Sequence, residues 1–247
     1  MKIVLTNDDG IFAPGLSALY RELTALGDVT VIAPADSQSG TSHSITFLEP
    51  LLCNRVDING LFAGFSVHGS PADCVKLACM ELIEDPIDLL VAGINHGANI
   101  GINVYYSGTV AAAMEAAFLR IPAAAISLAA EENMNFEQAA KYGVHVLRKL
   151  MPLRCGEVIN VNIPLLSLGQ PKGIKVVPQS TEGLHEHYLS SINELGQTVY
   201  QLAGGYHRFE STPTDTTALS EGYITVTALA PGMTDHKRNK KLLKIKW

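Results

Sequence analysis

Short apolar runs alternate with helix-like stretches along most of this chain, and this alternation constrains the fold more than any other feature. Residues 2–6 and 29–33 are apolar and rich in β-branched side chains, whereas residues 15–26 between them repeat apolar positions at helical spacing. Residues 88–94 and 123–128 are again apolar throughout, as strands covered on both faces tend to be. The order of these elements predicts right-handed βαβ units around a mostly parallel sheet.

The remaining elements follow the same order. Ser70, Pro71 and Asp73 supply an N-cap, a proline at the first helical position and a first-turn acid for a helix over residues 74–83. Two further helices and three further strands are predicted over residues 110–119, 135–150, 158–161, 174–177 and 223–229. With 247 residues, 47% of them hydrophobic, the chain can bury one large core, so we expect a single α/β domain over residues 1–247.

Two segments depart from this pattern. Residues 179–209 are polar and rich in His, Tyr and Glu, with Asn193-Glu194-Leu195-Gly196 between extended segments, and we expect a protruding hairpin or arm. Residues 231–247 follow a Pro-Gly turn and are expected to form an extended tail. In this tail lysines alternate with the apolar residues Leu242, Leu243, Ile245 and Trp247.

The charge distribution argues against a large polyanionic partner. The net charge is −6, but six of the 18 lysines and arginines follow Asp235 and no acid does, so an acidic body precedes a basic tail. An acidic body repels nucleic acid, and we favour a packed or solvated terminus for Lys237, Arg238, Lys240, Lys241, Lys244 and Lys246. No apolar stretch reaches the ~20 residues of a membrane span, and the N-terminus lacks a signal-peptide core, so we expect a cytoplasmic protein with no membrane contact.

Two adjacent carboxylates stand where the first predicted strand ends. Asp8 and Asp9 lie in the run Asn7-Asp8-Asp9-Gly10, and in an open parallel sheet the ligand crevice lies at the carboxyl ends of the strands. Hard divalent cations prefer oxygen ligands, and Mg²⁺ commonly binds one or two carboxylates together with phosphate and water. We therefore predict a metal site at Asp8 and Asp9. A plain Asp-Gly turn is the alternative, although a helix and not a pairing strand follows it.

Three further polar loops are expected at the same edge of the sheet. Their candidate residues are Ser39, Gly40, Thr41 and His43 after the second strand, Asn95, His96 and Asn99 after the third, and Ser107, Gly108 and Thr109 before the alanine-rich helix. Hydroxyl and backbone N–H groups in such loops can hold phosphate oxygens or a metal, and a helix N-terminus favours an anion. Taken singly, the loop that contains Ser39, Gly40 and Thr41 is equally consistent with a solvated Ser/Thr loop. Ser107, taken singly, is consistent with a plain N-cap.

The loops taken together resemble the signature blocks of the SurE survival-protein nucleotidases. The blocks are Asn7-Asp8-Asp9-Gly10, Ser39-Gly40-Thr41, residues 93–101, and Tyr106-Ser107-Gly108-Thr109-Val110-Ala111. Residues 69–76 and 214–219 are similar to two further blocks, so the resemblance spans nearly the whole chain. Ser70 stands where many members of that family have threonine.

This resemblance implies a Rossmann-like three-layer fold and hydrolysis of nucleoside 5′- and 3′-monophosphates, with cleavage of short polyphosphate in some members. It implies one divalent ion per subunit, Mg²⁺ or Mn²⁺, held by Asp8, Asp9, Ser39 and Asn95. It also implies a homodimer or homotetramer, joined through the tail and the arm.

The chemistry expected of these residues is hydrolysis at phosphorus. A metal at Asp8 and Asp9 can neutralise the phosphate and orient or ionise a water, and Asp9 is assigned as the carboxylate nearest that water, although the two roles can be exchanged. The phosphoryl oxygens would be held by Gly40, Thr41, Ser107, Gly108 and Thr109. His43 and His96 are candidates for protonating the leaving group, whereas a histidine in a polar loop more often only makes hydrogen bonds. A nucleotide-binding sensor without turnover is the alternative function.

Overall fold

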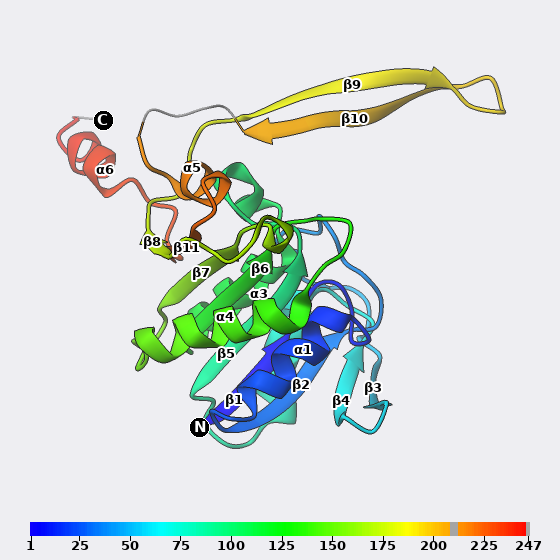
Figure 1. Cartoon of the computed structure of the whole chain (residues 1–247), viewed down its shortest axis with the longest axis vertical. Coiled ribbons are helices and arrows are strands. Elements are labelled where there is room, and N and C mark those ends of the chain that lie inside the picture. The colour runs from blue at the N-terminus through cyan, green and yellow to red at the C-terminus, as the bar shows by residue number, and fades with distance from the viewer. Residues whose placement is uncertain (208–211, 246–247) are drawn as a thin grey trace.

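The computed structural model describes residues 1–207 and 212–245 and places them in three layers with a projecting arm (Figure 1). The described strands of the body form one sheet in the order β3-β4-β2-β1-β5-β6-β7-β11-β8. These strands are β1 (Lys2–Thr6), β2 (Asp28–Pro34), β3 (Cys53–Ile58), β4 (Phe62–Val67), β5 (Leu89–His96), β6 (Ala123–Leu128), β7 (Val158–Ile163), β8 (Ile174–Val176) and β11 (Ile224–Leu229). Only the β3–β4 and β7–β11 neighbours are antiparallel among them, which confirms the expected mostly parallel α/β fold.

Helices cover both faces of this sheet. The helices α1 (Pro14–Leu23) and α4 (Phe136–Leu150) pack on one face, and α2 (Pro71–Leu77) and α3 (Gly108–Phe118) pack on the other. Along β1, Ile3 and Leu5 are buried on the side of α1 and α4, while Val4 is buried on the side of α2 and α3. Because both sides of the strand are covered, its residues are apolar without alternation.

The chain reverses its direction of travel across the sheet at β1. Strand β1 pairs in parallel with β2 on one side and with β5 on the other. In open α/β sheets ligands bind at such a switch point, outside the carboxyl ends of the strands. The loops that follow β1 and β5 therefore flank the crevice where a ligand is expected.

The β3–β4 hairpin is an element that the sequence analysis missed. Asn59 and Gly60 both have positive φ angles, 52° and 68°, and the Leu61 N–H donates to the Ile58 carbonyl over 2.9 Å. Asn-Gly is the strongest short-range hairpin signal because both residues tolerate positive φ, so the signal was present in the chain. The hairpin extends the sheet beyond β2.

The helix predicted over residues 74–83 begins at Pro71 and changes from an α-helix to a π-helix after Leu77. Ser70 and Asp73 form a capping box ahead of α2, as the predicted N-cap and first-turn acid require. After Leu77 the chain continues as a π-helix, η1 (Ala78–Leu82). The shorter described helices are η2 (Gly101–Tyr105), η3 (Leu166–Leu168) and α5 (Asp215–Ser220).

The expected arm is present as a two-stranded antiparallel ribbon (Figure 1). It consists of β9 (Leu184–Ile192) and β10 (Thr198–His207), and the side chain of Asn193 accepts hydrogen bonds from the N–H groups of Leu195 and Gln197 at its turn. The last two positions of the predicted arm, 208 and 209, lie outside the described residues. Several apolar side chains of the ribbon are exposed, among them Tyr188, Ile192, Tyr200 and Leu202.

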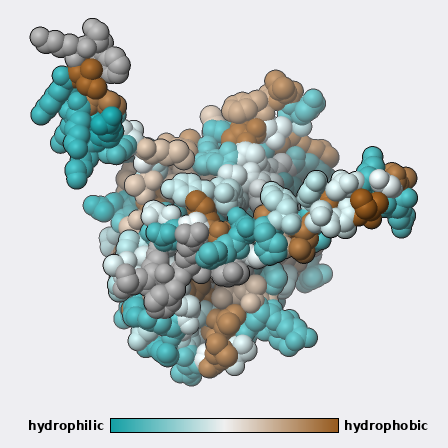
Figure 2. Space-filling model, turned by 90° about the horizontal axis from the view of Figure 1, so that it is seen from above, coloured by the Kyte–Doolittle hydropathy of each residue, from teal (hydrophilic) through white to brown (hydrophobic). Residues whose placement is uncertain are grey.

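The tail corrects a prediction, because it contains a helix where an extended segment was expected. Helix α6 (His236–Leu242) is capped by Asp235, whose Oδ1 accepts from the Arg238 N–H over 2.8 Å, and lysines in its last turn complement the helix dipole. Figure 2 shows this helix standing away from the body with mostly hydrophilic residues on its visible side. Lys246 and Trp247 lie outside the described residues. None of the helices in the described ranges is long and apolar enough to cross a membrane.

Candidate functional site

Asp8 stands at the end of β1 and faces the N-terminus of α3. The Thr109 hydroxyl donates to Asp8 Oδ1 over 2.5 Å, and the Thr109 N–H donates to Oδ2 over 3.2 Å. Gly108 fits between Asp8 and Pro71 only because it lacks a side chain. A Cβ at this position would lie 2.9 Å from Asp8 Cβ and 3.0 Å from Pro71 Cγ. The start of α3 therefore packs directly on the Asp8 carboxylate.

Asp9 points to a different neighbour. Its Oδ2 accepts a hydrogen bond from the His96 N–H over 3.1 Å, which links the loop after β1 to the end of β5. The adjacent carboxylates are thus held by two different elements, Asp8 by α3 and Asp9 by β5. Asp9 Oδ1 accepts no hydrogen bond from the described residues.

The charged forms of both carboxylates are destabilised by burial when no cation is bound. Burial raises the pKa of Asp8 to about 6, the neighbouring Asp9 charge adds to this, and the hydrogen bonds from Thr109 oppose it. Burial also raises the pKa of Asp9, against the hydrogen bond from the His96 N–H. No ion pair within the described ranges includes either aspartate. The pair is therefore a site of negative charge that a bound cation would stabilise.

Asn95 stands directly after an irregularity in the pairing of β5. The pairing of β5 with β6 shifts between Gly93 and Asn95, and Gly93 has a φ of 140° where an added Cβ would lie 2.3 Å from the Ile126 carbonyl oxygen. The Asn95 Nδ2 group donates to the Gly97 carbonyl over 2.6 Å. Since that partner is an acceptor, the amide nitrogen must face it, and Oδ1 is left as a side-chain oxygen for another ligand.

The loop that follows β2 is tied to the first carboxylate through its backbone. The Gln38 N–H donates to the Asp8 carbonyl over 2.7 Å. Ser39 is exposed and its hydroxyl contacts Ser37 Oγ at 3.2 Å. Gly40 has a φ of 72°, and the Thr41 hydroxyl donates to the Gln38 carbonyl over 2.8 Å, so the Thr41 hydroxyl is engaged within its own loop.

The hydrogen-bond donors at the start of α3 differ in whether they already have a partner. Ser107 Oγ accepts from the Val110 N–H over 3.1 Å and is an N-cap, and both donors of Thr109 are directed to Asp8. The Gly108 N–H makes no hydrogen bond with any described residue. Of the three residues expected to hold phosphate here, Gly108 alone presents an open N–H at the positive end of the helix dipole.

The remaining predicted residues lie in two different places. His96 is exposed next to Asp9, whereas His43 is directed away from the carboxylates: its Nε2 lies 2.8 Å from Glu115 Oε2 and its ring stacks on Phe118. Glu115 is seven residues along α3 from Gly108, a distance of about 10 Å at 1.5 Å per residue. The structure does not bring His43 to the site of the carboxylates.

Asn99 is buried and is held by side chains that the sequence analysis did not single out. The Asn162 side chain accepts from the Asn99 N–H over 2.8 Å, and the Nδ2 groups of Asn160 and Asn162 both donate to the Asn99 carbonyl. The Asn99 Nδ2 group donates to Ser127 Oγ over 2.9 Å. The signal was two asparagines within the apolar run of residues 158–163, since a buried amide needs a partner.

The side-chain oxygens of Asp8, Asp9, Asn95 and Ser39 suit one hard divalent cation. Carboxylate, amide and hydroxyl oxygens are the ligands that Mg²⁺ and Mn²⁺ prefer. Only two of the four are carboxylates, which agrees with the finding that no three Asp, Glu, His or Cys side chains cluster as metal ligands in residues 1–207 and 212–245. The donor set, together with the unpaired charge of the aspartates, fits the expected metal.

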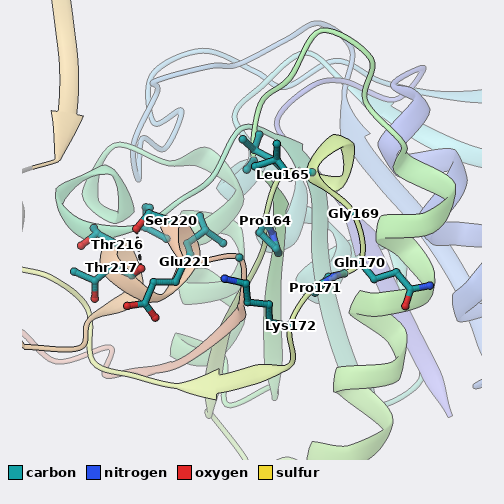
Figure 3. A pocket seen from close by; sticks show the side chains of 15 residues that line it. Pro164, Leu165, Gly169, Gln170, Pro171, Lys172, Thr216, Thr217, Ser220 and Glu221 are labelled. Atoms are coloured by element: carbon teal, nitrogen blue, oxygen red, sulfur yellow. Dashed lines mark hydrogen bonds between the residues drawn. The ribbon is translucent and has the colours of Figure 1, made fainter.

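A sizeable cavity lies elsewhere in the described residues. It has a volume of about 670 Å³ and is lined by the segment after β7 and by α5 (Figure 3). Its lining includes Leu165, Leu168 and Leu219, and among the four candidate loops it touches only Ile100. None of the candidate metal ligands borders this cavity, so its size does not identify it as the reactive site.

Comparisons of the sequence with a family model and with known proteins all point to one family. The family model described as Survival protein SurE matches residues 3–186. The chain belongs to the SurE family. A protein named 5′-nucleotidase SurE from Syntrophobacter fumaroxidans is 40% identical over 240 residues, which cover 96% of each chain. A protein of the same name from Syntrophus aciditrophicus is 42% identical over 238 residues, covering 95% of this chain and 90% of the relative.

The fold of this chain also matches that of a solved SurE protein. The crystal structure of the SurE protein from Aquifex aeolicus superposes with a TM-score of 0.84 at 38% sequence identity, covering 99% of this chain and 100% of the other. This chain therefore shares its α/β architecture with that SurE protein.

Proposed function

We propose that this chain is a divalent-metal-dependent phosphatase that releases phosphate from nucleoside 5′-monophosphates. The relatives named 5′-nucleotidase SurE match over nearly the full length of the chain, which supports the substrate class. The observation that carries the proposal is the pair Asp8 and Asp9 at the switch point of the sheet, neither of which forms an ion pair with a described residue. Residues 1–247 would act as one domain.

The residues around the pair have separable roles in this reaction. When bound, a divalent ion held by Asp8, Asp9, Asn95 and Ser39 supplies charge neutralisation of the phosphate and activation of water. Thr109 fixes both oxygens of Asp8, and the open N–H of Gly108 can donate to a phosphoryl oxygen at the N-terminus of α3. Asp9 Oδ1, which the described residues leave without a partner, can accept the proton of the attacking water.

Two extensions of the activity follow from the family resemblance. Nucleoside 3′-monophosphates and short polyphosphate present the same terminal phosphoryl group, so a site that recognises mainly this group would also accept them. We include both as substrates in the proposal. Because the exposed His96 lies beside Asp9, it stays the candidate for protonating the leaving group.

A panel of substrates tests this function. Phosphate release from mononucleotides, sugar phosphates and polyphosphate is measured with Mg²⁺, with Mn²⁺ and with EDTA. We expect metal-dependent release that is highest with nucleoside monophosphates. A sensor would instead bind the nucleotides in equilibrium dialysis and release no phosphate with any metal, and this result would overturn the proposal.

We also propose that the chain assembles into a homodimer or homotetramer through the arm and the tail. The exposed apolar side chains of the arm and the apolar residues at the end of α6 support this, because they are costly to leave in water. Light scattering over a dilution series should show a multimer for the full chain and weaker association after deletion of residues 233–247. Identical masses for the two proteins would remove the tail from the interface.

A further inference from the structure

The loop between β2 and β3 has little internal structure to hold it. Residues 35–52 contain no helix or strand. Beneath the loop, between residues 36–46 and the turn from β4 to α2, lies a polar hollow of about 290 Å³. None of residues 36–46 is buried, so their conformation depends on the hydrogen bonds that attach them to the body, beginning with the one from the Gln38 N–H to the Asp8 carbonyl.

Two of these attachments are made by the N-terminal ends of helices. The Ser42 N–H donates to the Tyr106 carbonyl over 3.1 Å, just ahead of α3. Ser70 Oγ donates to the Ser44 carbonyl over 2.7 Å, and the Asp73 carboxylate accepts from the N–H and the hydroxyl of Thr46. These contacts hold the second half of the loop against α2 and the start of α3.

A further attachment is made by a buried carboxylate in the middle of α3. Glu115 is 5% exposed, and one of its oxygens lies 2.8 Å from His43 Nε2 while the other lies 2.7 Å from Lys76 Nζ. The His43 ring stacks on Phe118, with centroids 5.5 Å apart and planes inclined by 11°. The hydrogen bond from His43 is the main reason why the pKa of Glu115 lies below its ordinary value. A buried carboxylate costs free energy unless it is paired, so the pairing of Glu115 with His43 and Lys76 is favoured in the folded state.

We propose that His43 and Glu115 are positioning residues that latch residues 36–46 onto α3 and so hold Ser39 and Gly40 beside the aspartate pair. Helix α3 is then the common support of the site: its first turn fixes Asp8 through Thr109, and its middle fixes the loop through Glu115. The role of Ser39 in this inference rests on the proposed function. The latch itself rests on the contacts alone.

The test compares His43→Ala with a matched variant, Lys76→Met, which removes the other partner of Glu115 without touching the loop. Hydrogen exchange reports the amides of residues 37–46, and calorimetry reports Mn²⁺ binding to the full-length protein. In His43→Ala we expect exchange of the loop amides and the Mn²⁺ dissociation constant each to rise roughly tenfold, the scale of one lost charge-assisted hydrogen bond. Lys76→Met should leave both near their wild-type values.

A rescue variant separates positioning from general destabilisation. Glutamine at position 43 keeps an N–H donor of similar reach, so His43→Gln should recover most of the loop protection and Mn²⁺ affinity. Unchanged loop exchange in His43→Ala would overturn the latch, as would equal loosening in Lys76→Met or no recovery in His43→Gln. If the wild type bound no Mn²⁺, the proposed metal site would fail, while the exchange data would still decide whether the latch exists.

Discussion

The Thr109 hydroxyl lies 2.5 Å from Asp8 Oδ1, and the Thr109 N–H lies 3.2 Å from Asp8 Oδ2. One residue at the start of α3 therefore donates to both oxygens of the first carboxylate after β1. The orientation of Asp8 is fixed by the fold before any ion or substrate is bound, which is the preorganisation that an exacting site requires.

Replacing Thr109 by valine should remove the shorter of these hydrogen bonds at nearly constant volume. We expect Thr109→Val to lower kcat and metal affinity by roughly tenfold, because supporting hydrogen bonds to metal ligands typically contribute 10- to 100-fold. Thr109→Ser keeps the hydroxyl and should stay near wild type. Phosphate release over a Mn²⁺ titration measures both effects, and equal behaviour of the two variants would show that the hydroxyl does not support Asp8.

Gly108→Ala should distort the site directly. Its new Cβ would meet Asp8 Cβ at 2.9 Å and Pro71 Cγ at 3.0 Å, so α3 or the end of β1 must shift. We expect a loss of about 1–3 kcal/mol in the free energy of unfolding, as for other overpacked positions, together with most of the activity. Gly183→Ala, where the added Cβ meets nothing within 4 Å, is the control. Equal urea midpoints for the two variants would contradict the close packing of Gly108 on Asp8.

The stability of the metal-free protein should fall as the pH rises. Burial raises the folded-state pKa of Asp8 to about 6 from an ordinary value of 3.8. Because the folded state binds the proton more tightly, this stability is fully present below pH 3.8 and is lost as the pH rises through 6. The loss is at most about 3 kcal/mol, since one pKa unit corresponds to about 1.4 kcal/mol.

Urea unfolding in EDTA and in saturating Mn²⁺ measures this dependence. In EDTA the free energy of unfolding should decline between about pH 4 and pH 6, and bound Mn²⁺ should offset the decline. Parallel pH profiles with and without metal would mean that Asp8 does not face the ion.

Asn162→Ala should remove two of the three side-chain hydrogen bonds that hold the backbone of Asn99. The buried N–H of Asn99 loses its acceptor and the carbonyl loses one of two donors, so we expect a cost of about 1–3 kcal/mol. Asn54→Ala on the exposed side of β3 is the matched control and should be near neutral. Thermal unfolding compares the two variants. A neutral Asn162→Ala would show that the loop after β5 is held by other contacts.

The parts of the fold that the sequence predicts are those specified by neighbouring residues. The apolar run before Asp8 and the capping box of Ser70 and Asp73 are local patterns, and the structure shows the strand and the helix that they indicate. The arm likewise follows from the turn at Asn193. The β3–β4 hairpin is also specified locally, by the turn at Asn59 and Gly60.

The parts that could not be predicted depend on pairs distant in the chain. Thr109 and Asp8 are 101 residues apart, and His43 and Glu115 are 72 residues apart. The polar pattern indicates that such residues need partners, but only the folded sheet determines which partners meet. For this reason the sequence predicts a phosphate contact for Thr109 and a proton-donor role for His43, whereas the structure directs Thr109 to Asp8 and His43 to Glu115.

Phosphate release from nucleoside 5′-monophosphates by the wild type, Asp8→Asn and Asp9→Asn, each with Mn²⁺ and with excess EDTA, tests the central claim most directly. We predict metal-dependent release by the wild type and a loss of at least about 100-fold in each variant, more than the loss of an outer hydrogen bond to a metal site causes. Far-ultraviolet circular dichroism should show that both variants stay folded. Undiminished wild-type turnover in EDTA, or wild-type turnover by either folded variant, would contradict a metal site at Asp8 and Asp9.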